Sequence, residues 1–143
     1  MDPRGASVLS SFVLDTSATL VLVLDDEPGA PVQALLTALG AGDPCVPSLW
    51  PYEVASGLES ARKRGRLTPA DVEMALQQIG RMRIEHDDRS ADIVHLTNLA
   101  ARLEITPYDA AYISLATARG IPLATQDRRL AQVARGIGVS VID

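Results

Sequence analysis

Four acidic residues stand where apolar segments of this sequence begin or end, and they are the groups best placed to do chemistry. Asp15 ends a short apolar run, and Glu53 lies in the first turns of an apolar-faced helix. Asp109 opens a segment of almost wholly apolar or small residues, and Asp127 follows the apolar run 121–125. Burying a carboxylate is costly unless something pairs with it, and a metal ion is one such partner.

Taken singly, each acid also has a structural interpretation. Asp15 and Asp127 could cap the helices that follow them, and Glu53 could be a surface acid favoured by its helix dipole. In open α/β sheets, however, ligands bind beyond the carboxyl ends of strands. Four acids at comparable element ends are harder to explain by separate structural roles, so we treat them together as a candidate site.

The sequence contains its own control for Asp109. Thr68-Pro69-Ala70-Asp71 repeats the pattern of Thr106-Pro107-Tyr108-Asp109. Both motifs can be explained by helix capping alone, in which a threonine caps the helix and an acid three residues later bonds back to it. The helix after Asp71 carries polar residues, whereas the segment from Tyr108 to Ala118 is almost wholly apolar, as in a buried helix. We therefore expect the two acids to differ in role.

The remaining patterns predict the elements that must position these acids. Strands are expected at 11–15, 45–47, 82–85, 121–125 and 139–142. Helices are expected at 18–24, at 31–39, at 68–79, at 106–120 and around 130–134, with a loop at 25–29. Thr16 and Ser17 are the expected caps of the first helix, and Gly40 and Gly42 should end the second. Two more helices are expected, one from a Ser48 cap to the basic run 62–66 and one that starts at Ser90. Short strands alternating with helices favour parallel pairing and a three-layer α/β domain.

Length and composition are those of an ordinary globular domain. The chain has 143 residues, 47% of them hydrophobic and 22% charged, so it can bury a core and is not disordered. We predict a polar leader at 1–11 and a single domain at 12–143. The lone Cys45 excludes an intramolecular disulfide and a cysteine metal cage, and we expect a core thiol. No apolar run has the length of a signal peptide or a membrane span, which predicts a cytoplasmic protein.

The net charge of −5 is not that of a typical nucleic-acid-binding protein. It does not exclude nucleic-acid binding, because acidic residues gathered around metal ions are locally neutralised. Charge alone therefore leaves the class of substrate open.

Four segments, taken in order, resemble the PIN-domain ribonucleases, and specifically the toxins of VapBC-type toxin–antitoxin pairs. They are Phe12-Val-Leu-Asp15-Thr-Ser17, Pro51-Tyr-Glu53-Val-Ala, Tyr108-Asp109-Ala-Ala-Tyr-Ile-Ser-Leu-Ala116 and Leu123-Ala-Thr125-Gln-Asp127-Arg-Arg-Leu130. The resemblance implies a short twisted parallel sheet flanked by helices, with an acidic pocket formed by Asp15, Glu53, Asp109 and Asp127. It also implies an RNA substrate and an antitoxin partner. One position departs from the family pattern, because Ser56 stands where many relatives have asparagine.

The chemistry of these residues fits that resemblance. Four oxygen-only carboxyl groups suit Mg²⁺ or Mn²⁺ better than zinc. Without a metal, acids this close repel one another, so at least one should have a raised pKa. Thr16, Ser17, Thr125 and Ser56 are candidates for hydrogen bonds that fix the carboxylates. We expect a metal-dependent endoribonuclease, and we regard a homodimer as the expected assembly.

Two other functions stay open at this point. In the first, the chain keeps the fold as a catalytically silent module that only binds a partner; absence of metal binding beside normal partner capture would favour it. A metal-dependent phosphatase would instead turn over small phosphomonoesters and leave RNA intact. Apolar positions at 20–24 and around Trp50 could serve a partner, a homodimer or the core.

Overall fold

A parallel sheet lies at the centre of the computed structural model, which describes residues 10–24 and 30–143. Within those residues the sheet has five strands in the order β3-β2-β1-β4-β5, and every neighbouring pair is parallel. The strands are β1 (Phe12–Leu14), β2 (Pro44–Val46), β3 (Glu85–His86), β4 (Leu123–Ala124) and β5 (Val141–Ile142). The parallel pairing predicted from the alternation of strands and helices is confirmed.

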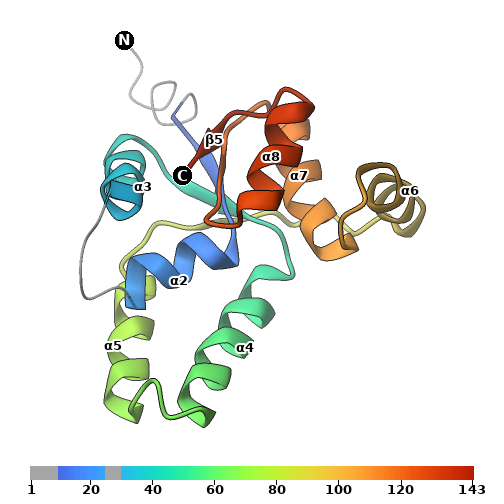
Figure 1. The fold of residues 1–143 in the computed structure, drawn as a ribbon. Helices are drawn as coiled ribbons and strands as arrows, with labels where there is room; N and C mark the ends of the chain where they lie inside the picture. Colours follow the sequence, from blue (N-terminus) through green and yellow to red (C-terminus); the bar gives the residue numbers. More distant parts are fainter. Residues whose placement is uncertain (1–9, 25–29) are drawn as a thin grey trace.

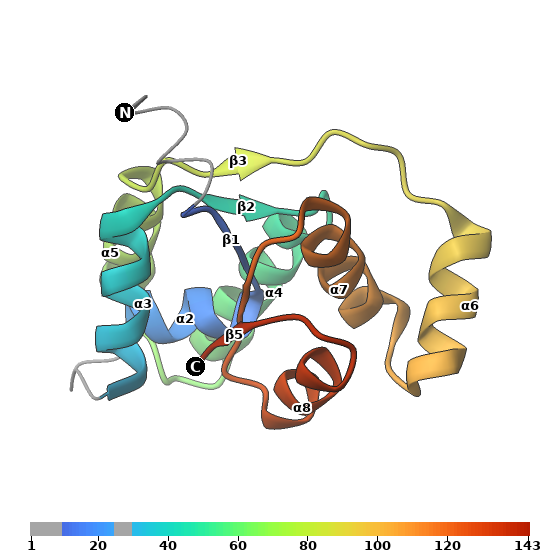
Figure 2. The same ribbon diagram turned by 90° about the horizontal axis from the view of Figure 1, so that it is seen from above.

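Helices cover both faces of this sheet (Figures 1 and 2). They are α2 (Thr16–Leu24), α3 (Ala30–Ala41), α4 (Trp50–Lys63), α5 (Pro69–Gly80), α6 (Ile93–Leu103), α7 (Pro107–Arg119) and α8 (Arg128–Gly136). In both views α3 lies on one side of the sheet and α7 and α8 on the other, with α6 outside α7. This is the predicted three-layer α/β architecture. No helix among the described residues is long and apolar enough to cross a membrane.

The core is built on the central strand. All three residues of β1 are buried, as are those of its neighbours β2 and β4, because a parallel strand covered on both faces has no solvated side. Cys45 of β2 is a buried free thiol, as predicted, and burial raises its pKa to about 11. The sheet is therefore a rigid base for whatever follows its strands.

A close contact between α2 and α4 fixes two helices that carry candidate site residues. A Cβ added at Gly57 of α4 would lie 2.8 Å from Cδ1 of Leu20, so a larger residue would require the Leu20 side chain to shift. The Trp50 indole N–H donates to Thr19 Oγ1 at 2.9 Å, which ties the start of α4 to α2. Trp50 is buried, so of its possible uses the core is the one that the structure supports.

Several predicted helix starts were wrong by one to three residues. The cap of α2 is Asp15, whose Oδ1 accepts the Ala18 N–H, and not Thr16 or Ser17. Helix α4 starts after Leu49 without a side-chain cap, so Ser48 does not cap it. Helix α6 is capped by Asp92 and not by Ser90. Before α2 and α6 the sequence offers more than one polar residue that could meet the free N–H groups, and the predicted one is not the one that does so.

The bounds or the burial of several other elements differ from the prediction. Helix α3 runs through Gly40 to Ala41, and only Gly42 ends it, at a point where any side chain would collide with Ser10. The strand expected at 82–85 is displaced: β3 is Glu85–His86 and shares only Glu85 with the predicted range. Helix α7 is buried or half-buried from Asp109 to Ala116 and exposed at its two ends, at Tyr108 and at residues 117–119. The predicted loop at 25–29 and most of the predicted leader at 1–11 lie outside the described residues.

Candidate active site

The candidate site lies at the carboxyl end of the two central strands. From β1 the chain passes to β2 and β3 on one side, whereas β4 and β5 extend the sheet on the other. The β1–β4 pair is therefore the point where the strand order reverses, which is where open α/β sheets bind their ligands. Asp15 directly follows β1, and Thr125 and Asp127 follow β4.

Asp15 is the most deeply buried of the four acids, at 5% exposed. Its Oδ1 accepts hydrogen bonds from Ser17 Oγ at 2.7 Å and from the Ala18 N–H at 2.8 Å. Burial raises the pKa of Asp15, while these bonds and one from Thr125 oppose the rise. The predicted capping role is confirmed, and the capping bonds also fix the orientation of the carboxylate.

Glu53 is held by side chains from two other helices. Thr16 Oγ1 donates to Glu53 Oε1 at 3.0 Å, and the Tyr112 hydroxyl donates to the same oxygen at 2.7 Å. Burial raises the pKa of Tyr112, and the adjacent Glu53 raises it further, so the phenol stays protonated and remains a donor. Both bonds fall on Oε1, an arrangement that leaves the other oxygen for a further ligand.

Ser17 and Thr125 connect the segments that follow β1 and β4. Their hydroxyl oxygens lie 3.4 Å apart, and Ser17 Oγ accepts the Gln126 N–H at 2.9 Å. Thr125 Oγ1 accepts the Asp127 N–H at 3.1 Å. The predicted roles of Ser17 and Thr125 in fixing acidic residues therefore correspond to contacts in the structure.

Asp127 is the N-cap of α8. Its Oδ1 accepts the N–H groups of Arg129 and Leu130 at 3.0 and 3.1 Å, as the structural interpretation of this residue predicted. Capping does not remove the residue from the site, because its negative charge still acts on the other acids. Together with Asp109 and Thr106 it lines a shallow hollow of about 280 Å³.

Asp109 is the residue whose pKa reports the proximity of the four acids. Burial raises that pKa, and the charges of Asp127, Asp15 and Glu53 raise it further, in that order. The expectation that at least one carboxyl group has a raised pKa is thus met by Asp109 as well as by Asp15. The negative charges that help to raise the pKa values of Asp15 and Asp109 form an arrangement whose repulsion a cation would relieve.

The four carboxylates do not form a compact cluster. Within residues 10–24 and 30–143, no three acidic, histidine or cysteine side chains lie close enough to hold a single metal ion. The donor chemistry nevertheless fits a hard cation, because all four side chains offer only oxygen. The pKa shifts and the lack of a three-residue cluster are compatible, because charges act over longer distances than the contacts that coordinate a metal ion.

Ser56 makes the weakest case among the predicted residues. It is exposed on α4 and lines a hollow of about 480 Å³ together with Thr16, Glu53, Arg64 and Arg66. Tyr112, by contrast, was given no role by sequence reasoning although it binds Glu53 directly. Its position three residues after Asp109, on the same face of a helix, is the signal that points to it.

Comparisons with known proteins place this geometry in context. The family model described as "PIN domain" matches residues 12–136. The chain is 33% identical over 119 residues to Ribonuclease VapC9 of Mycobacterium tuberculosis and to VapC ribonuclease Mb0985 of Mycobacterium bovis, which covers 83% of this chain and 87% of each relative.

Solved structures show the same fold at lower identity. PAE2754 from Pyrobaculum aerophilum superposes with a TM-score of 0.69 at 21% identity, over 98% of this chain and 88% of that one. VapBC2 from Rickettsia felis, bound to a DNA fragment from its promoter, superposes with a TM-score of 0.63 at 18% identity, over 92% and 96% of the two chains.

Proposed function

The chain belongs to the PIN domain family, and from that premise we propose that it is a Mg²⁺- or Mn²⁺-dependent endoribonuclease, the toxin of a toxin–antitoxin pair. The observation that carries the proposal is the gathering of four acidic segments around the ends of β1 and β4, where burial of Asp109, and then the charges of Asp127, Asp15 and Glu53, raise its pKa. It supports a single acidic centre built from four distant segments. The ribonuclease names of relatives with 33% identity supply the substrate class.

The four carboxylates are the groups that would hold the metal. Asp15 and Glu53 are the most firmly positioned, by the bonds from Ser17, Ala18, Thr16 and Tyr112. A bound divalent ion supplies polarisation of a scissile phosphate, activation of a water and neutralisation of the leaving oxygen. The protein contributes the orientation of the ligands and, through Ser17 and Thr125, a fixed distance between the β1 and β4 segments.

Arg64 and Arg66 are placed to bind the RNA backbone. They line the same hollow as Glu53 and Thr16, at the basic end of α4. Arg62 in the same run is already paired with Glu59, its Nη2 lying 2.6 Å from Oε1. Arginines along a hollow that leads to an acidic centre offset the protein's net negative charge where a phosphodiester chain would approach.

The decisive experiment is incubation of purified protein with total RNA, with and without Mg²⁺, beside Asp15→Asn. Cleavage should require the metal and should be lost in the variant, while thermal unfolding shows that the variant is folded. Equal cleavage by both proteins would disprove the site assignment. Absence of metal binding in calorimetry, beside normal capture of a partner, would favour a silent binding module. Turnover of phosphomonoesters without RNA cleavage would indicate a phosphatase.

The partners follow from the same proposal. We expect a cognate antitoxin, encoded by a small reading frame immediately upstream, and a homodimer in the cytoplasm. Half-buried Leu20, Val21 and Leu24 line a groove beside Arg66, so part of the 20–24 face is open to a partner. Light scattering of the purified protein, alone and with the upstream gene product, measures both assemblies.

A further inference from the structure

A second cavity, of about 380 Å³, lies beside the acidic site and takes no part in the functions assigned so far. It is lined by α6, α7, residues 47–49 and the loop 87–92. Its walls are largely apolar, with Leu49, Leu96 and Leu115 among them. Arg89, Asp92, His95 and Ser114 add polar groups. An apolar cavity with a few convergent polar groups is the usual form of a small-ligand site.

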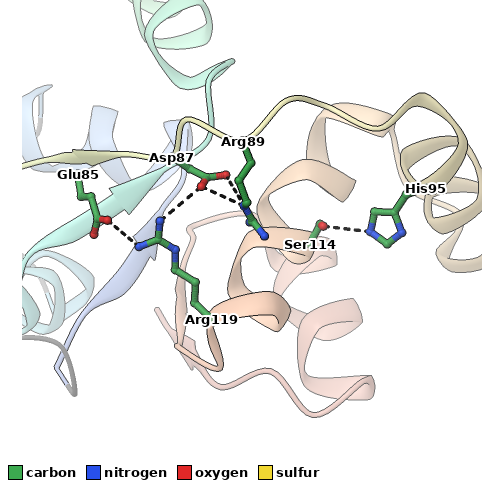
Figure 3. A network of polar contacts seen from close by, with 6 residues as sticks. All are labelled: Glu85, Asp87, Arg89, His95, Ser114 and Arg119. Atoms are coloured by element: carbon green, nitrogen blue, oxygen red, sulfur yellow. Dashed lines mark hydrogen bonds and ion pairs between the residues drawn. The ribbon is translucent and has the colours of Figure 1, made fainter.

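Ion pairs and a hydrogen bond hold the cavity walls in place (Figure 3). Asp87 Oδ1 accepts from Arg89 Nε at 3.1 Å and from Arg119 Nη2 at 3.4 Å, which fastens the loop to α7. Arg119 also pairs with Glu85 of β3 at 2.9 Å. His95 Nε2 and Ser114 Oγ lie 3.0 Å apart and join α6 to α7. The cavity is therefore preformed, so a ligand would not have to order it on binding.

The cavity shares its supporting elements with the acidic site. Leu49 lines it and is the N-cap of α4, the helix whose first turn carries Glu53. Tyr108 lines it and directly precedes Asp109 in the first turn of α7. Tyr108 at the rim of the cavity and Asp109 in the acidic site are neighbours in the chain, so the two sites meet at the first turn of α7.

We propose that this cavity binds one unpaired nucleobase of the RNA, next to the scissile phosphate, and so sets the sequence preference of cleavage. The inference rests on the proposed ribonuclease function. Single-stranded RNA is recognised by bases that are splayed out, stacked on aromatic or arginine side chains and hydrogen-bonded at their edges. Tyr108, which is 63% exposed at the rim, offers such a ring. Arg89, Asp92 and Ser114 offer donors and acceptors for a base edge.

Tyr52 provides a matched control for Tyr108. It is also a tyrosine in the first turn of a helix, it also directly precedes a candidate metal ligand, and it is 80% exposed. Tyr52 is not among the residues that line the cavity. General stacking of RNA near the acidic site would involve both rings, whereas recognition in the cavity requires Tyr108 alone.

The test begins with cleavage of a randomised short RNA by the wild type, Tyr108→Ala and Tyr52→Ala, with sequencing of the cut ends. The wild type should prefer one base at a fixed position beside the cut. Tyr108→Ala should lower cleavage at the preferred sites by about 5- to 150-fold, the range for losing one base–aromatic stack. The base preference should weaken with it, because the base is no longer held against the polar groups that read its edge. Tyr52→Ala should leave the preference at that position unchanged.

A second measurement replaces the nucleotide at the preferred position by an abasic one. Cleavage by the wild type should fall by a similar factor, while Tyr108→Ala should cleave the abasic and the intact RNA almost equally. A merely structural role of Tyr108 would slow both substrates and leave their ratio unchanged. Ala111→Phe, which adds bulk to the lining, should also reduce the ratio if the variant remains folded.

The outcomes distinguish failure of the base site from failure of the ribonuclease function on which it rests. If the wild type cleaves no RNA, the proposed function fails and the base site fails with it. If the wild type cleaves but shows no base preference, or if Tyr108→Ala keeps the preference, only the base site is overturned. Unchanged RNA preference with weakened antitoxin capture would assign the cavity to the protein partner and would overturn the proposal equally.

Discussion

Two segments of this protein share the pattern Thr-Pro-x-Asp and the same local structure, yet their acids have opposite properties. Thr68 and Thr106 both adopt extended backbone angles, and the hydroxyl of each accepts the N–H of the following acid at 3.1 Å. Asp71 Oδ2 then turns back to accept the Thr68 N–H at 2.9 Å, which lowers its pKa. The pKa of Asp109 is raised, because burial and three other carboxylates act on it.

The difference shows what local sequence does and does not determine. A capping threonine and proline set the helix start in both places, since that geometry needs only neighbouring residues. Whether the pKa of the acid is raised or lowered depends on the residues that surround the helix. Asp71 is exposed to solvent, whereas Asp109 lies beside the ends of β1 and β4. Helices α5 and α7 therefore offer matched positions at which the effect of the surroundings can be measured.

The largest difference is expected in catalysis. Asp109→Asn should reduce RNA cleavage by at least about 100-fold, because even residues that only support metal ligands cost about 10- to 100-fold. Asp71→Asn should cleave within twofold of the wild type, since its carboxylate contacts only its own helix cap. Initial rates at saturating Mg²⁺ measure both. Similar losses in the two variants would mean that Asp109 is merely structural.

Metal-linked stability should separate the same two variants. A ligand at 100 times its dissociation constant stabilises a protein by about 2.7 kcal/mol. We expect Mg²⁺ to raise the melting temperature of the wild type and of Asp71→Asn, and to have little effect on Asp109→Asn. Chelation should abolish cleavage by the wild type, and Mg²⁺ or Mn²⁺ should restore it. A shift that persists in Asp109→Asn would place the metal elsewhere.

The comparison extends one turn along each helix. Tyr112 follows Asp109 by three residues and is buried against Glu53, whereas Met74 follows Asp71 by three residues and is 60% exposed. Tyr112→Phe should reduce cleavage about 10-fold by loosening Glu53, and Met74→Ala should not change it. A titration with Mg²⁺ distinguishes the mechanisms, because added metal should recover part of the rate if Tyr112 acts by positioning a ligand. A deficit that metal leaves unchanged would contradict that role.

Sequence reasoning was reliable for features set by neighbouring residues and weak for contacts between distant ones. The parallel sheet, the Thr68 and Thr106 caps and the helix-capping interpretation of Asp127 are confirmed, because periodicity and capping are local properties. The bond from Tyr112 to Glu53 joins residues 59 positions apart, and no local pattern specifies it. The Ser48 and Ser90 caps were wrong for a related reason, since packing determined which residue started each helix.

The smallest predicted effect is on stability without metal, and its sign differs between the two acids. An acid with a raised pKa in the folded state destabilises that state once pH rises above its ordinary value of 3.8. Asp109→Asn should therefore raise the free energy of unfolding at pH 7 in chelator. Because Asp109 is only half-buried, solvent screening limits the gain to less than about 1 kcal/mol.

Asp71 should behave in the opposite way. Its lowered pKa contributes stability above pH 3.8, which is lost as pH falls through the lower folded value. Asp71→Asn should thus destabilise the protein at pH 7, and the deficit should shrink in acid. Both substitutions remove a negative charge from a first turn, so the helix-dipole contribution cancels when the two variants are compared. Urea unfolding in chelator measures the difference, and a loss of stability in Asp109→Asn as large as that in Asp71→Asn would mean that the acidic site exerts no repulsion on Asp109.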